Sequence, residues 1–390
     1  MKNKFLVLIP LAIFLFSCSF PRSPKPLITE SDTQEIFAEQ EEKPVLYNLS
    51  LIAAGDNLFH ETIIRAYLQD GLYDFSPIYS EIKSLIENAD LAFINQETVM
   101  AGEAFGYSGY PLFNTPQSLA KTLADTGFSI INQANNHAMD MGRAGLYATL
   151  DLWDTIDGIT VLGARKTGES YSIIKKNNIT LGFLSYTYGL NGIPLPAGEP
   201  NLVSLINRTR MAREIEALRP LCDFLIVSVH WGEEYLMEPD SFQTGLALFL
   251  AEHNVDLIIG HHPHVLQGVE TLDRPDGKKT LCFYSLGNFV SNQREKERIL
   301  GALMMVNFTK ESSSSGDELS ISNFGLIPVV CHIAQNYTST TVYPLYSYTE
   351  ELLEKHHLQR HGTIDFDFFY SVLRNLMTKI IMYNPFLSRS

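Results

Sequence analysis

Short apolar runs alternate along the chain with segments whose apolar side chains recur at helical spacing. The runs have the length of buried β-strands and occupy residues 49–54, 90–94, 129–132, 180–186, 223–229, 257–259 and 281–285. Helical spacing occurs at residues 76–87, 204–218 and 240–252, and between Thr115-Pro116 and Gly127. Strands that alternate with helices in this way predict an α/β fold.

The pattern changes near residue 300. Residues 303–308 and 324–330 are predicted strands around a serine-rich loop at 312–315. Residues 350–357 and 366–383 are predicted helices that pack on the core. Three histidines at the end of the first of these helices are interpreted as solvated rather than metal-binding: His356, His357 and His361.

Polar side chains that can bind metals follow five of the predicted strands. They are Asp56, Glu97, Asn136 with His137, His230, and His262 with His264. α/β proteins place their sites at the carboxyl ends of strands, and carboxylates and neutral imidazoles are ligands for Mn, Fe or Zn ions. Each residue alone could be an ordinary turn or cap residue. Their repetition at one topological position predicts a metal site.

The densest of these motifs is residues 256–267, D-L-I-I-G-H-H-P-H-V-L-Q. Gly260 is expected to let the backbone turn sharply after a buried strand, and Pro263 to stiffen the loop that follows. His262 and His264 are two residues apart, so both could face one point from a loop. Three histidines in four residues favour a ligand loop over a chance polar loop.

Composition restricts the classes of partner. The 390 residues are 45% apolar and 19% charged, which suits a globular protein of two or three domains or one large α/β domain with extensions. The formal net charge of −15 argues against a nucleic-acid partner and against electrostatic adhesion to anionic lipid.

The first 18 residues are typical of a bacterial lipoprotein signal peptide. Lys2 and Lys4 precede an apolar stretch at residues 5–16 that is too short to span a bilayer as a helix. Residues 15–18, L-F-S-C, resemble a lipobox with cleavage before Cys18 and lipid on its sulfur. A plain secretory signal or an uncleaved anchor is the alternative. Cleavage would remove two lysines and change the net charge from −15 to −17, so acyl chains would hold the chain to the membrane.

Together the motifs resemble those of the CapA family of bacterial poly-γ-glutamate and capsule biosynthesis proteins. The matching segments run in the family's order from about residue 49 to 289: A-A-G-D, I-N-Q-E, P-L-F-N-T-P, A-N-N-H-A-M-D-M-G, V-H-W-G-E-E-Y, G-H-H-P-H-V-L-Q and Y-S-L-G-N-F. Members resemble calcineurin-like metallophosphatases in fold. The resemblance therefore implies an α/β fold of two sheets packed as a sandwich and flanked by helices (α-β-β-α), with metals at the strand ends.

The expected organisation has four parts. A signal peptide and lipobox (1–18) precede a disordered tether (19–46) rich in Pro, Ser, Glu and Gln. The metallophosphatase-like domain follows at 47–295, and C-terminal strands and helices (296–390) pack on its core. Cleavage and lipidation would make the protein exported and lipid-anchored on the extracytoplasmic face of the cell membrane.

The resemblance also implies residue roles. The metal ligands would be Asp56, Glu97, Asn136, His230, His262 and His264. Glu97 would bridge two divalent transition-metal ions, Mn, Fe or Zn. His137 would be the general acid, with Asp140 orienting it. The wider phosphatase pattern has Asp-x-His in the first motif, where this chain has Leu58, so one ion is expected to be weakly held. Two further ligand candidates are His60 and His261.

Two functions are consistent with these features. The first is a metal-dependent, phosphoesterase-like hydrolase that acts on an anionic envelope polymer or its phosphorylated carrier; two ions would activate water for this attack. Mixed oxygen and nitrogen ligands without cysteine favour this catalytic interpretation. The second is a non-catalytic lipoprotein that binds the polymer, its synthase or the export machinery, with a structural metal site.

Overall fold

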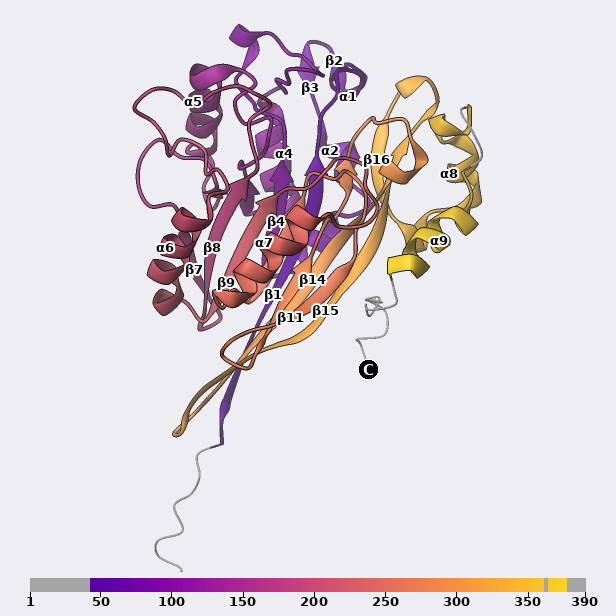
Figure 1. Ribbon diagram of the computed structural model, residues 1–390. Helices are drawn as coiled ribbons and strands as arrows, with labels where there is room; N and C mark the ends of the chain where they lie inside the picture. Colours follow the sequence, from indigo (N-terminus) through magenta and orange to yellow (C-terminus); the bar gives the residue numbers. More distant parts are fainter. Residues whose placement is uncertain (1–42, 361–363, 377–390) are drawn as a thin grey trace, which may run out of the picture. The chain divides into compact units, whose positions relative to one another are not determined.

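The computed structural model describes residues 43–360 and 364–376, which form two packed β-sheets with helices on their outer faces (Figure 1). The predicted signal peptide, lipobox and most of the predicted tether lie outside the described residues, as do His361 and the end of the last predicted helix. Among the helices of the described ranges, none has the length and apolar character needed to cross a membrane.

The first sheet has eight strands in the order β16-β15-β14-β1-β4-β5-β6, with β13 paired to the end of β1. Its strands are β1 (Val45–Asn57), β4 (Leu91–Gln96), β5 (Ile130–Asn132), β6 (Thr160–Leu162), β13 (Asn288–Val290), β14 (Leu300–Ser313), β15 (Gly316–Ile333) and β16 (Thr340–Pro344). β1 pairs in parallel with β4 and antiparallel with β14. The C-terminal strands therefore extend the same sheet that the first strand begins.

The second sheet has six strands in the order β11-β12-β10-β9-β8-β7. Its strands are β7 (Ser172–Lys176), β8 (Ile179–Thr187), β9 (Phe224–His230), β10 (Leu257–His261), β11 (Val269–Asp273) and β12 (Lys279–Phe283). The four central strands are parallel, and the two edge strands are antiparallel to their neighbours. A separate hairpin is formed by β2 (Leu68–Gln69) and β3 (Leu72–Tyr73).

The α-helices are α1 (Glu61–Ala66), α2 (Ser76–Tyr79), α3 (Lys83–Glu87), α4 (Ser118–Thr126), α5 (Gly142–Trp153), α6 (Arg208–Leu218), α7 (Ser241–Glu252), α8 (Glu350–Lys355) and α9 (Phe366–Leu376). The short 3₁₀ helices are η2 (Glu103–Phe105), η3 (Arg219–Leu221), η4 (Lys296–Arg298), η5 (Gln335–Tyr337), η6 (Leu345–Ser347) and η7 (His357–Arg360). The segment predicted as one helix at 76–87 is two short helices separated by a turn at 80–82, where Ile82 has a φ of −113° instead of about −63° as in a regular helix.

Successive side chains of β1 point to opposite faces of the first sheet, which explains how the layers of the sandwich pack. Leu49, Leu51 and Ala53 join the core between the two sheets, whereas Ile52 and Ala54 pack beneath helices α2 to α4. Both faces of the strand are buried, which is why its sequence is a continuous apolar run. The outer face of the second sheet is covered by α6 and α7 (Figure 1). The expected α-β-β-α sandwich is confirmed.

Gly260 does not turn the chain, contrary to the prediction from the sequence. It lies inside β10, where an added β-carbon would stand 2.0 Å from the carbonyl oxygen of Tyr284. The glycine therefore permits a close approach of two backbones. The turn comes later, where His262 (φ 98°) and His264 (φ 59°) adopt left-handed conformations that few side chains tolerate.

The histidines after α8 are also placed differently from the prediction. α8 ends at Lys355, and His356 continues in an extended conformation that forms a β-bridge with Ala334. The Nε2 atom of His356 lies 3.2 Å from the carbonyl oxygen of Cys331. His356 is fully buried and His357 is 6% exposed, so the interpretation of a solvated helix end is wrong. These histidines belong to the packing of the C-terminal segment on β15.

Candidate metal centre

The carboxyl ends of strands from both sheets meet at one edge of the sandwich. β1, β4 and β5 of the first sheet and β9 and β10 of the second carry the six side chains predicted as ligands, at their ends or in the loops that follow. None of the six exposes more than 3% of its surface: Asp56, Glu97, Asn136, His230, His262 and His264. The structure therefore brings together residues that are up to 208 positions apart in the chain.

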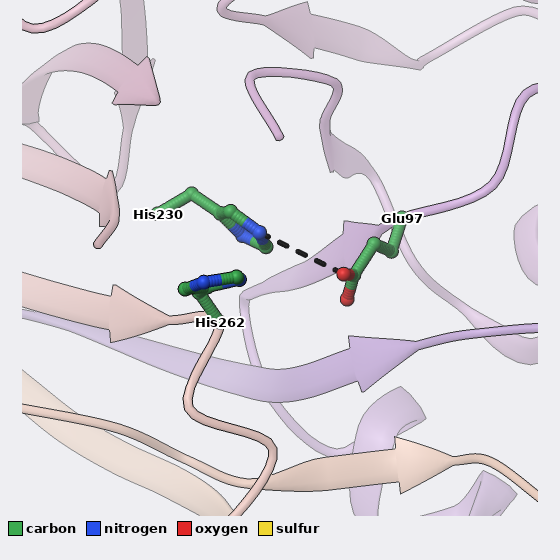
Figure 2. A group of neighbouring side chains, drawn as sticks. All are labelled: Glu97, His230 and His262. Atoms are coloured by element: carbon green, nitrogen blue, oxygen red, sulfur yellow. Dashed lines mark ion pairs between the residues drawn. The ribbon is translucent and has the colours of Figure 1, made fainter. Parts of the chain in front are cut away.

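A continuous series of short contacts connects these side chains. His264 Nδ1 lies 3.0 Å from Asp56 Oδ2, and His264 Nε2 lies 3.7 Å from Glu97 Oε1. Glu97 Oε1 is 3.6 Å from His230 Nε2, which lies 2.9 Å from Asn136 Oδ1. Figure 2 shows the carboxylate of Glu97 directed toward the rings of His230 and His262. The six residues thus form one cluster.

Glu97 belongs to two groups of ligand atoms. One group is Asp56, Glu97 and His264, and the other is Glu97, His230 and His262; within each, the ligand atoms lie within 4.8 Å of one another. Both oxygens of Glu97 are buried without a hydrogen-bond partner, as is Nδ1 of His262. A buried carboxylate without compensation is costly, so these residues fit a bound cation. Glu97 is the carboxylate that these two groups share.

Charge in the cluster is balanced between Asp56 and His264. Burial alone would raise the pKa of Asp56, but the nearby imidazoles of His261 and His264 hold that pKa well below its usual value. Burial alone would lower the pKa of His264, but the nearby carboxylates of Glu97 and Asp56 raise it to about 9. At neutral pH, His264 is therefore a cation that compensates Asp56. A metal ion would supply this positive charge instead, and His264 would lose its proton.

Burial shifts the pKa values of three other members of the cluster toward their neutral forms. Burial raises the pKa of Glu97 well above its usual value. Burial also lowers the pKa of His262 to about 3 and lowers that of His230 well below its usual value. A neutral imidazole is the form that binds a metal, so His230 and His262 need not lose a proton to become ligands.

His137 and Asp140 lie beside the ligand groups. His137 Nδ1 is 2.8 Å from Asp140 Oδ2, and the same oxygen accepts a hydrogen bond from the backbone N–H of Phe113 at 2.7 Å. The imidazole packs edge-on against the ring of Phe113, with 4.7 Å between ring centroids. These contacts fix the orientation of the ring, and the predicted role of Asp140 toward a general acid stays a prediction. His137 follows Asn136 in the chain, which keeps it next to the cluster without adding it to a ligand group.

The two further candidates differ in their positions. His261 Nδ1 lies 3.5 Å from Asp56 Oδ1, and its ring stacks on Phe93. His60 is in none of the ligand groups that the described residues form. Its Nδ1 lies 3.2 Å from the backbone nitrogen of Asn292, which donates to it, and burial lowers its pKa to about 4. His261 therefore supports Asp56, while His60 holds a neighbouring loop.

Three polar residues of the site were not predicted. Asn95 donates to Asp56 Oδ1 at 2.8 Å. Asn191 contacts both Asn136 and His137, at 3.2 Å and 3.3 Å. Glu234 forms a third ligand group with His262 and His264. Asn95 lies within the I-N-Q-E motif and could have been found there, whereas Asn191 precedes Gly192 like any asparagine of a turn.

The fold and the site define a class of protein: an α-β-β-α sandwich with a buried carboxylate and histidine cluster at its strand ends. The chain belongs to the bacterial capsule synthesis protein family PGA_cap, whose family model matches residues 50–293. That range is more than half of the chain and contains all six residues of the cluster. The resemblance drawn from the motifs is confirmed.

Two curated relatives extend this result. The chain is 34% identical over 187 residues to the PGA biosynthesis protein CapA of Bacillus subtilis (strain 168). This match covers 46% of this chain and 47% of the relative. The chain is 31% identical over 187 residues to the capsule biosynthesis protein CapA of Bacillus anthracis, which covers 45% and 43%. The matched regions span less than half the length of these relatives.

Solved structures with a similar arrangement include two nucleotidases. The NAD nucleotidase (NadN) of Haemophilus influenzae has a TM-score of 0.44 and 14% identity, covering 87% of this chain and 60% of that one. A 5′-nucleotidase precursor from Thermus thermophilus has a TM-score of 0.44 and 15% identity, covering 85% and 59%. Each likeness extends over most of this chain and little more than half of the nucleotidase.

Proposed function

We propose that this protein is a metal-dependent phosphoesterase that acts on an anionic envelope polymer or its phosphorylated carrier. The observation that carries the proposal is Glu97, whose two unpartnered, buried oxygens are shared by two ligand groups. Two divalent ions held there would activate water and stabilise the negative charge that develops on a phosphoester. Mn, Fe and Zn ions all accept this mixture of carboxylate and imidazole ligands.

The protein's own residues would bind the ions and move the proton. Asp56 and His264 would hold one ion and His230 and His262 the other, with Glu97 between them and Asn136 beside His230. Asp140 holds Nδ1 of His137, so the other ring nitrogen, Nε2, is the one that can give a proton to the leaving oxygen of a substrate.

A second candidate function is favoured by the relatives' names. Both are described as biosynthesis proteins, of PGA and of capsule, which is a role that hydrolysis does not by itself explain. The alternative is a non-catalytic lipoprotein that binds the polymer, its synthase or the export machinery. In that case the metal site would be structural, and no phosphoester would be turned over.

Metal content together with turnover of bis(p-nitrophenyl) phosphate tests the proposal. After expression with Mn, Fe and Zn supplied, the purified chain is expected to contain bound metal and to hydrolyse this diester. A His262→Ala variant is expected to lose metal and turnover together, because His262 belongs to the ligand group with Glu97 and His230.

His253→Ala is the matched control for that variant. His253 is the C-cap residue of α7, and its Nδ1 contacts the backbone oxygen of Phe249 within the same helix. The control is expected to keep both metal and turnover. Absence of bound metal from the unchanged chain after expression with Mn, Fe and Zn would contradict the proposed metal centre. Equal metal content in the His262→Ala and His253→Ala variants would also contradict it.

We further propose that the chain is exported and anchored by lipid at Cys18, which follows the L-F-S motif. Labelling of cells with a fatty-acid analogue is expected to mark the unchanged protein and not a Cys18→Ala variant, since the thiol would be the acylated group. A Cys222→Ala variant, which changes another free cysteine, controls for nonspecific labelling. Equal labelling of Cys18→Ala and the unchanged chain would exclude this anchor.

A further inference from the structure

A cleft of about 660 Å³ opens beside His262. Three aromatic side chains line it and expose part of their surface: Tyr188 (43%), Tyr235 (37%) and Phe242 (45%). His262 also lines the cleft, although it is only 3% exposed, and its Nδ1 is buried without a partner. His262 therefore links the cleft directly to the metal cluster, so a ligand in the cleft would lie next to the metal centre.

The cleft is acidic as well as aromatic. Glu233, Glu234 and Asp240 line it, and none of the described residues in its lining is lysine or arginine. Glu234 lies close to Tyr235, because its carboxylate adds to the effect of burial in raising the pKa of the Tyr235 hydroxyl. Burial and this same carboxylate raise the pKa of Tyr188 to about 12. Carboxylates and aromatic rings thus face one space.

A nearby contact shows that one of these rings accepts a cation. The guanidinium of Arg298 lies 3.4 Å from the centre of the Tyr235 ring. Arg298 is not in the cleft lining, and it is paired with Glu295 at 2.7 Å, so its charge is already compensated. The three carboxylates of the cleft are therefore not balanced by this arginine.

The metal centre does not balance them either. Asp56 and Glu97 bring two negative charges to the centre, and two divalent ions would bring four positive ones. The remaining positive charge matches the oxyanion of a phosphoester. Glu233 and Asp240 are in none of the ligand groups formed by the described residues, whereas Glu234 is in one with His262 and His264. All three carboxylates line the cleft and would repel any further anionic group of the substrate. The polymer's own carboxylates therefore do not fit the cleft.

We propose that this cleft binds an ammonium group carried by the phosphoester whose phosphate lies at the metal centre. The phosphate part of this inference rests on the proposed hydrolase function, and the ammonium part rests on the cleft alone. Carboxylates attract a cation, and exposed aromatic faces bind quaternary and other ammonium groups. The substrate class is thus a zwitterionic phosphoester, in which a cationic amine is joined to the phosphate by a short linker.

The test compares choline with 3,3-dimethylbutan-1-ol, which has the same shape and no charge. Each is titrated calorimetrically into the full chain, as purified and after removal of metal by a chelator. Choline is expected to bind about 10-fold more tightly than the neutral alcohol, since cation–π and ion-pair contacts act on the charge alone. The double variant Glu233→Gln, Glu234→Gln is expected to remove this preference, and Phe242→Ala to weaken choline binding.

Glu238→Gln is the matched control, because Glu238 is a glutamate of the same loop that is not in the cleft lining. It is expected to bind choline like the unchanged chain. Equal affinity for both probes, binding of neither, or an unchanged preference in the double variant would each overturn the inference. Choline binding without diester hydrolysis would contradict the hydrolase alone. Hydrolysis without a preference for choline would contradict the ammonium site alone.

Discussion

A Glu97→Gln variant is expected to lose the bound metal pair and, in its metal-free form, to be more stable than the unchanged chain. Glu97 is shared by both ligand groups, so its loss affects both ions. Without metal, its two oxygens are buried and have no hydrogen-bond partner. Glutamine keeps the shape of the side chain but cannot ionise, so it is expected to raise the free energy of unfolding by about 1–3 kcal/mol at a pH where the buried carboxyl is charged.

The gain in stability should depend on pH with a defined sign. Burial raises the folded-state pKa of Glu97 well above its usual value of 4.5. The neutral carboxyl is tolerated below the unfolded-state pKa, and its contribution to stability is lost as pH rises through the folded-state pKa. The gap between Glu97→Gln and the unchanged chain should therefore be small near pH 4.5 and widen as pH increases.

Urea unfolding of chelator-treated protein across this pH range measures the effect. Glu103→Gln removes an exposed glutamate and is expected to change stability little at any pH. If the difference in unfolding free energy between the two chains stays constant with pH, ionisation of buried Glu97 does not cause it. Retention of two ions by Glu97→Gln would remove it from the bridging position.

His137→Ala is expected to reduce turnover of a phosphodiester by about 10²–10⁴-fold, which is the usual contribution of a general acid. Bound metal should change little, because His137 is in none of the ligand groups formed by the described residues. Thermal stability should fall, since the variant loses the contacts of the imidazole with Asp140 and Phe113. Asn136→Ala should lose metal as well as turnover, since Asn136 Oδ1 contacts His230 at 2.9 Å. Metal analysis, thermal unfolding and steady-state kinetics distinguish the two variants.

His137→Ala, together with Asp140→Asn, also separates the two candidate functions. A helper lipoprotein predicts no turnover by the unchanged chain and polymer export that survives His137→Ala. A hydrolase predicts that His137→Ala and Asp140→Asn both lose turnover, with a changed pH profile in the second, because Asp140 orients the imidazole through Nδ1. Export that is unaffected by His137→Ala, without turnover of any diester, would leave only the fold and the metal cluster.

The residues at the strand ends could be predicted because their positions follow from local rules. Asp56 and His230 lie at the ends of apolar runs, and the period of those runs fixes where the chain leaves the sheet. Their meeting at one edge follows from parallel pairing of strands. The roles of these side chains as ligands stay a prediction, since the structure shows their proximity.

Other features depend on contacts between distant segments, which no local pattern contains. Gly260 looks like a turn residue, but the carbonyl oxygen of Tyr284, directly after the neighbouring strand β12, leaves no room there for a β-carbon. His356 looks solvated after a short polar helix, but β15 covers it. Glu234 looks like one of two adjacent surface acids until the fold places it near His262 and His264.

The course of β1 has a practical consequence for how the protein can be held. Val45, at one end of the strand, pairs with Ser312 at the tip of the β14–β15 hairpin, and Asp56 lies at the other end in the metal cluster. At about 3.3 Å per residue, the strand separates these two positions by about 36 Å. A surface linker attached at the Val45 end would therefore immobilise the domain for binding or turnover assays while leaving the approach to the cluster open.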